Sequence, residues 1–184
     1  MEEARRLSFK RLQQIRCELP QKYRIREQNL CKNFRKDPSP PIAKLKKLYA
    51  FLDELQTFVT KYTPCKSRCS ACCHIPVTIS EIEVEYIRQS VNIDLISQKA
   101  QGPDNACPFL GEDLCSIYEV RPFMCRTHFS LAGTARWCKP PFCNTVMLPM
   151  VRFSEVDKTY GEIVEGYGSV RVVKIKEAFR RDFL

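Results

Sequence analysis

The chain has 184 residues, a formal net charge of +9 and 11 cysteines, which suits one domain or one domain with an appendage. An odd number of cysteines excludes complete pairing into internal disulfides. The sequence has no apolar run of the roughly 20 residues that a membrane-spanning helix needs, and its N-terminal segment lacks the apolar core of a signal peptide, so we expect a cytoplasmic protein.

The positive charge is concentrated in the first third of the chain. Residues 1–61 carry 15 basic and 7 acidic residues, a net of +8, and residues 62–184 carry a net of +1. We expect a basic helical leader over 1–61, a cysteine-cluster metal-binding domain over 62–150 and a C-terminal extension over 151–184 that packs on the same domain. The leader indicates an anionic partner such as nucleic acid. The alternative is a solvated helical face, because no base-reading motif or stacking aromatics accompany the charge.

Helix formers dominate the leader. Residues 2–18 predict a helix, and the prolines of 36–41 predict a break after which Ser39 caps a new helix. Apolar residues at intervals of three and four predict that this second helix runs to about residue 62 and ends before Pro64. They are Leu45, Leu48, Tyr49, Leu52, Leu55, Val59 and Tyr62.

The remaining elements are short. Residues 74–80 predict a brief strand, and Ser80 with Glu83 has the spacing of a capping box at the start of a helix over about 80–90. We further expect a hairpin over 107–118, loops over 129–149, and a strand followed by a basic helical end beyond residue 162. The expected fold class is therefore α+β and mainly helical. In it, N-terminal helices pack against a small, loop-rich, metal-stabilised cysteine core with a short hairpin.

Cysteines are dense after residue 64. Thiolates suit zinc and iron, which usually take four such ligands. Three short-spaced pieces stand out: the cluster CKSRCSACC, a C-x2-H pair and a C-x4-C pair. The candidate metal ligands are Cys65, Cys69, Cys72, Cys73, Cys107, Cys115, Cys125, His128, Cys138 and Cys143. Because neighbouring side chains point apart, Cys72 and Cys73 need not bind one ion, and the spacing leaves the number of ions open.

Other residues near the cluster have competing interpretations. His74 and His128 can bind metal or instead orient a ligand by hydrogen bonding. Cys17 and Cys31 are isolated in the leader, which favours packing or exposure. Cys125 with His128 could form a nucleophile and its base, but so many neighbouring thiols favour metal. Arg121 can lower thiolate pKa values or form a structural ion pair.

Two motifs resemble a known family. CKSRCSACC, followed by CPFLGEDLCSIYEVRPFMCR at 107–126, is similar to the CxxCxxCC cysteine-cluster family, also called the YkgJ-type zinc- or iron-chelating domain. The resemblance covers about residues 62–128. It implies metal chelation by the cysteines at the matching positions, which are Cys65, Cys69, Cys72, Cys73, Cys107, Cys115 and Cys125. The metal is expected to be a zinc or iron ion with a chiefly structural role.

The first cysteine gap departs from the family pattern. It reads C-x3-C-x2-C-C, a spacing that radical SAM enzymes also use, but the 111 residues after Cys73 lack the alternating strands and helices of such a barrel. An iron–sulfur cluster stays an alternative, since cysteines suit it equally. Flagellin lysine methylases look similar in this region, which implies redox or methyl-transfer activity. The sequence shows no Gly-rich nucleotide loop, so whether the protein is an enzyme, and its catalytic residues, stay open.

Overall fold

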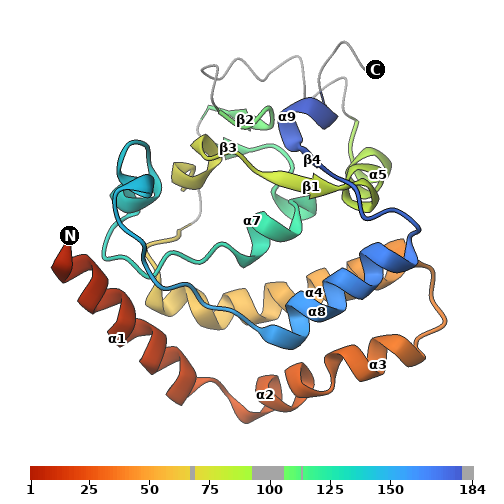
Figure 1. The fold of residues 1–184 in the computed structure, drawn as a ribbon, viewed down its shortest axis with the longest axis horizontal. Helices are drawn as coiled ribbons and strands as arrows, with labels where there is room; N and C mark the ends of the chain where they lie inside the picture. The colour runs from red at the N-terminus through yellow and green to blue at the C-terminus, as the bar shows by residue number, and fades with distance from the viewer. Residues whose placement is uncertain (67–68, 93–105, 113, 180–184) are drawn as a thin grey trace.

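The computed structural model describes residues 1–66, 69–92, 106–112 and 114–179. As predicted, the described chain is mainly helical and carries two small antiparallel sheets (Figure 1). The leader forms α1 (Glu2–Glu18), α2 (Gln21–Gln28), α3 (Leu30–Lys36) and α4 (Pro41–Val59), and the 3-10 helix η1 (Thr60–Tyr62) follows α4. Within the described ranges, every helix is too short or too polar to cross a bilayer.

Helix α4 is the central element of the helical layer. Its buried face carries the predicted apolar residues from Leu45 to Val59, and Leu45, Leu48, Leu52 and Leu55 are fully enclosed. The predicted Tyr62 lies beyond the helix in η1 and is only partly buried. The predicted N-cap is wrong by one residue: Pro40 is the N-cap and Pro41 the first helical residue, a position that needs no amide N–H. Ser39 instead donates its backbone N–H to the Asp37 carboxylate at 2.9 Å.

The sequence analysis did not predict α8 (Ser154–Gly166), which packs against α4 and α3. Figure 1 shows α4 and α8 side by side, with α1, α2 and α3 along the outer edge of the pair. Val156, Ile163 and Val164 of α8 join the main apolar core. The segment after residue 151 therefore packs directly on the leader helices.

The cysteine-bearing half consists of short elements on the other side of α4 (Figure 1). The sheets pair β1 (Thr78–Ser80) with β4 (Val172–Lys174) and β2 (Leu110–Gly111) with β3 (Leu114–Cys115), so the predicted strand and hairpin are present. The helical elements are η2 (Ala71–His74), α5 (Glu81–Ser90), η3 (Tyr118–Val120), α7 (Phe123–Thr127), η4 (Ala135–Cys138), η5 (Phe142–Asn144) and α9 (Ile175–Ala178). Residues 98–106, whose polar sequence QKAQGPDNA predicts turns, lie almost entirely outside the described residues.

Two smaller apolar clusters flank the main core. One, formed by Ile79, Ile87, Phe109, Ile117, Ile175 and Phe179, lies under the hairpin. The other joins Ile15 of α1 and the end of α4 to the loop after α7, through Phe58, Val59, Phe129, Leu131 and Val151. Both ends of the cysteine-bearing half are thus supported by apolar packing.

Candidate metal centre

Two backbone hydrogen bonds lie within the first cysteine motif. Cys69 donates its amide to the Lys66 carbonyl at 3.1 Å, and Cys73 donates to the Ser70 carbonyl at 2.9 Å. The second bond opens η2, which carries both Cys72 and Cys73. The two adjacent thiols hydrogen bond to each other, so they lie closer together than the sequence analysis expected.

The second motif is fastened directly to the first. The amide of Cys107 donates to the carbonyl of Cys73 at 2.7 Å. Cys115 pairs in register with Leu110 across the hairpin, and both Cys107 and Cys115 pack against the cluster around Phe109. The hairpin and the backbone hydrogen bond between Cys107 and Cys73 together place these two thiols beside η2.

Backbone amides point at the sulfur atoms of the hairpin. Cys107 receives the N–H of Phe109, and Cys115 receives the N–H of Ile117, the residue two positions later in each case. An N–H donor stabilises the thiolate over the thiol. This arrangement suits sulfur atoms that carry negative charge, as metal-bound cysteines do.

Cys125 is brought in by α7. This helix starts right after Pro122, and the Phe123 amide donates to the buried Glu83 carboxylate at 2.6 Å. Arg126, which follows Cys125 in the chain, is only 2% exposed. Its guanidinium donates to Asp53 of α4 at 2.5 Å and to the Arg121 carbonyl at 3.0 Å. These contacts fix α7 against α4 and so fix the position of Cys125.

Four of these thiols form a first group, which we call the hairpin group: Cys72, Cys107, Cys115 and Cys125. The thiols are close enough for negative charge on one to raise the pKa of another. Burial is nevertheless the largest cause of the raised pKa at Cys107, Cys115 and Cys125, and the pKa of Cys107 rises to about 11. For Cys72 the hydrogen bond with Cys73 comes first and burial second. Without a cation these thiols are therefore neutral at pH 7.

A second group gathers around Ser130, which follows α7. We call Cys65, Cys69 and Cys138 the loop group. The Ser130 backbone N–H points at the sulfur of Cys65, and its hydroxyl bonds the thiol of Cys138. Cys69 and Cys72 lie near enough to both thiols to raise their pKa, though burial raises it more. Contact between η2 and η4 brings the two groups together at Cys72.

His128 presents an unused ligand atom. Its Nε2 is buried and has no hydrogen-bond partner, the sole such side-chain atom in the described residues. Burial lowers the pKa of the imidazole, which favours its neutral, metal-binding form. A buried nitrogen without a partner is costly to a protein, so a bound cation would satisfy an existing defect.

The other candidates are placed less centrally. Cys143 lies on η5, which packs on η4, and the structure does not bring it into either group. His74 ends η2. Cys17 is exposed on α1, and buried Cys31 hydrogen bonds to Glu162 of α8, far from the cluster in the fold. Both cysteines are thus placed as the sequence analysis favoured.

Sequence analysis missed the part played by Glu83. The capping box with Ser80 is present as predicted, but the same carboxylate is 1% exposed and accepts bonds from Tyr49 of α4 at 2.7 Å and Tyr160 of α8 at 2.6 Å. With the Phe123 amide, it joins α4, α5, α7 and α8 at one point. The capping motif signalled the residue, but burial and its long-range partners depend on the fold.

Arg121 and Arg126 have a structural role here. Arg121, 6% exposed, donates to the Tyr118 carbonyl at 2.6 Å and pairs with Asp53 at 3.4 Å. Its charge also lowers the thiol pKa of Cys72 and Cys115, against the larger raising effects there. For Arg121, both alternatives raised by the sequence thus apply.

A family model matches this part of the chain. The model is CxxCxxCC, described as "Putative zinc- or iron-chelating domain", and it spans residues 64–144. Residues 64–144 match the CxxCxxCC family. The resemblance predicted from the two motifs is confirmed, and the match extends past residue 128 to include Cys138 and Cys143. Neither the curated proteins nor the solved structures gave a significant match to the chain.

The donor set of the CxxCxxCC segment fits a zinc or iron ion. Its thiols, the N–H groups aimed at sulfur and the unpartnered His128 nitrogen are all of the kind such ions select. As the side chains stand, no three His, Cys, Asp or Glu residues within the described ranges are already arranged around one point. Binding would thus require side-chain rotation, and a cysteine needs only one χ1 change to re-aim its sulfur.

Proposed function

We propose that the CxxCxxCC segment binds zinc or iron through its clustered cysteines and that the metal is chiefly structural. The observation that carries this proposal is the hairpin group, in which four partly buried thiols from η2, the hairpin and α7 are near enough for negative charge on one to raise the pKa of another. Neutral buried thiols gain little from such proximity, whereas a dication offsets half of the negative charge of four thiolates and binds their sulfur atoms directly. We place the protein in the cytoplasm, where thiols stay reduced.

The two groups of thiols support two neighbouring centres. The first takes Cys72, Cys107, Cys115 and Cys125. The second takes Cys65, Cys69 and Cys138, with its fourth ligand supplied by His128, Cys73 or Cys143. Cys72 lies beside both, so its loss affects both centres.

A structural role follows from how little regular structure this segment has. Its strands β2 and β3 have two residues each, and η2, η4 and η5 are single turns. Structural zinc in finger peptides contributes about 10–16 kcal/mol of apparent binding free energy. A contribution of that order is enough to order loops that bury little apolar surface themselves.

Metal removal tests the structural role. After complete chelation, or in Cys72→Ser, we expect protease cleavage within 65–143 while α4 and α8 stay protected. Cys17→Ser is the matched control, because this cysteine is exposed on α1 and should behave as the wild type. Unchanged thermal stability and protease resistance in fully metal-free protein would contradict a structural role.

The all-thiolate composition of the hairpin group also favours a second candidate, an iron–sulfur cluster. Metal content, acid-labile sulfide and the visible spectrum of anaerobically purified protein separate the two. Equal amounts of iron and sulfide with visible absorbance support the cluster. Zinc without sulfide or colour supports the first proposal.

A further inference from the structure

Four basic residues of α1 are free of internal partners. Arg5, Arg6, Lys10 and Arg16 are exposed, and in the described part of the chain none of them forms an ion pair. Elsewhere in the leader, basic residues are used internally: Arg26 pairs with Glu54, and Arg35 pairs with Glu162. Lys32, Lys36 and Lys44 of α3 and α4 likewise form no ion pair in the described part of the chain, so charge alone does not distinguish α1 from the rest of the leader.

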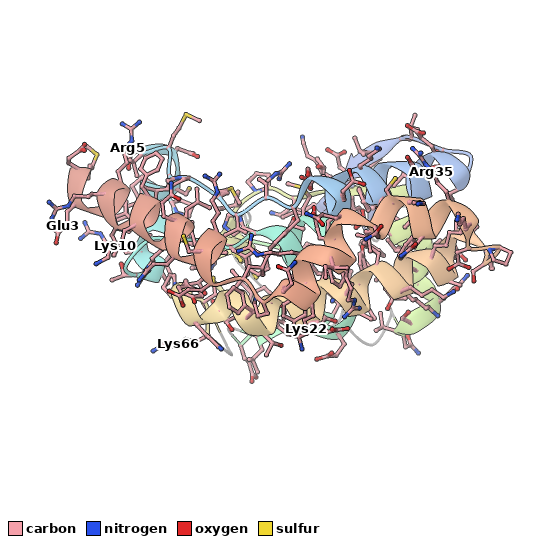
Figure 2. The ribbon with its side chains drawn as sticks, turned by 90° about the horizontal axis from the view of Figure 1, so that it is seen from below. Glu3, Arg5, Lys10, Lys22, Arg35 and Lys66 are labelled. Carbon is pink, nitrogen blue, oxygen red and sulfur yellow. The ribbon has the colours of Figure 1, made fainter. Side chains whose placement is uncertain are left out.

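An aromatic ring lies among these cations. Phe9 is 49% exposed, and the helical repeat places it on one line with Arg5 and Arg16, with Arg6 and Lys10 beside that line. We call these five residues the α1 basic face. Figure 2 shows Arg5 and Lys10 projecting from α1 at one end of the molecule. The sequence analysis found no stacking aromatic with the charge, and Phe9 corrects that interpretation.

The opposite face of α1 is already occupied. Ile15 is buried with Phe129 and Leu131 in the cluster that joins α1 to the loop after α7, and Leu12 packs on it. Arg11 donates to the Leu131 carbonyl at 3.2 Å and to the Ala132 carbonyl. The α1 basic face is therefore held in a fixed orientation, which lowers the entropy cost of binding.

The chemistry of the face selects its ligand. A helix that lies on a membrane needs a broad apolar face, but the apolar face of α1 is buried and the exposed side offers one aromatic ring. Cations that flank an exposed ring match phosphates that flank a base, since bases stack on aromatic side chains and phosphates attract basic ones. Glu2 and Glu3 lie in the first turn, at the end of this face.

We propose that the α1 basic face binds single-stranded nucleic acid, with Phe9 stacking on a base and Arg5, Arg6, Lys10 and Arg16 contacting phosphates. The surface lies on α1, outside the CxxCxxCC match at 64–144. It is therefore a function additional to metal binding and does not depend on the identity of the metal.

Fluorescence anisotropy with a short labelled single-stranded oligonucleotide and the full chain tests the proposal. Four phosphate contacts predict that log K falls with log salt at a slope of about −3. The triple variant Arg5→Glu, Arg6→Glu, Lys10→Glu should lower affinity at least about tenfold and flatten that slope. Phe9→Ala should lower affinity about tenfold, and Phe9→Trp should retain it.

The matched control is Lys32→Glu, Lys36→Glu, Lys44→Glu, which changes the net charge equally on α3 and α4 and should lower affinity much less. Circular dichroism confirms that each variant is folded. Equal loss in both triple variants, no effect of Phe9→Ala, or equal affinity for a duplex would overturn the proposal. So would binding to anionic phosphatidylserine vesicles without binding to the oligonucleotide.

Discussion

The Cys107 amide donates a 2.7 Å hydrogen bond to the Cys73 carbonyl, which joins two cysteine motifs that are far apart in the sequence. The first motif contributes thiols to both proposed centres, and the second completes one of them. The CxxCxxCC segment is therefore one unit, and the residues that hold its parts in place are as open to testing as the thiols.

Replacing Glu83 with glutamine should destabilise the protein strongly. The carboxylate accepts hydrogen bonds from two tyrosine hydroxyls, from the Ser80 amide at 2.8 Å and from the Phe123 amide. In the glutamine variant an NH2 group would replace one carboxylate oxygen, and this NH2 cannot accept the hydrogen bonds that the oxygen accepts now. We expect a loss of about 2–4 kcal/mol in the free energy of unfolding, measured with urea. Metal affinity should fall as well, because the anchor of α7 is lost. Glu85→Gln, partly buried on the same helix, is the control, and equal effects of the two would contradict this account.

Asp53→Asn tests how α7 is fixed to α4. Asp53 pairs with Arg126 at 2.5 Å and with Arg121 at 3.4 Å, and both guanidinium groups are nearly buried. Leaving them without a carboxylate should cost about 1–3 kcal/mol of unfolding free energy. The neighbouring Glu54→Gln removes an exposed pair with Arg26 and should cost at most about 1 kcal/mol. Thermal unfolding of both variants measures the difference, and the reverse order would refute the assignment.

His128 and His74 offer a matched test of ligation. In metal-free protein, His128→Phe should leave the free energy of unfolding unchanged or raise it, because the substitution removes a buried Nε2 that has no hydrogen bond to lose. In metal-loaded protein the same substitution should lower metal affinity and stability, and His74→Phe should lower neither. Competition with a chromogenic chelator measures affinity. If both variants retain wild-type affinity, His128 is not the fourth ligand.

Acid should weaken the contact between α3 and α8. The hydrogen bond from Arg35, followed by that of Cys31, lowers the pKa of Glu162 to about 2 from 4.5. A pKa lowered by folding means that this contribution is present above about pH 4.5 and lost as the pH falls toward 2. Since the pair is exposed, Glu162→Gln should cost only about 0.5 kcal/mol at pH 6.

That difference from wild type should disappear near pH 2, and Glu165→Gln, on the exposed side of α8, serves as the control. Urea titrations across this pH range measure both. A difference that grows on acidification would have the wrong sign for this ion pair.

Local sequence signals predicted the local elements. Apolar spacing found α4, and the Ser80–Glu83 motif found the start of α5. Helix α8 was missed although Val156, Tyr160 and Ile163 have helical spacing, because two glycines and several β-branched residues weaken its intrinsic propensity. Packing on α4 and α3 supplies the stability that propensity does not.

The candidate site divides in the same way. Cysteine spacing and the two motifs predicted the candidate ligands and the family resemblance, since those signals are continuous in the chain, and the resemblance is confirmed by the match at 64–144. The division into a hairpin group and a loop group depends on Ser130 and on the bond between Cys73 and Cys107, which are contacts between distant segments. Spacing alone cannot report such contacts, and the division of the chain into three parts stays a prediction.

The bonds from Arg11 to the carbonyls of Leu131 and Ala132 have a thermodynamic consequence. They connect the helix of the basic face to the loop between His128 and Cys138, so order in one favours order in the other. If metal tightens that loop and thereby improves anion binding on α1 by some factor, reciprocity requires an anion on α1 to raise metal affinity by the same factor. Arg11→Met would weaken this connection and so reduce the factor by which each ligand affects the other, while Ile15 would still pack on Phe129 and Leu131.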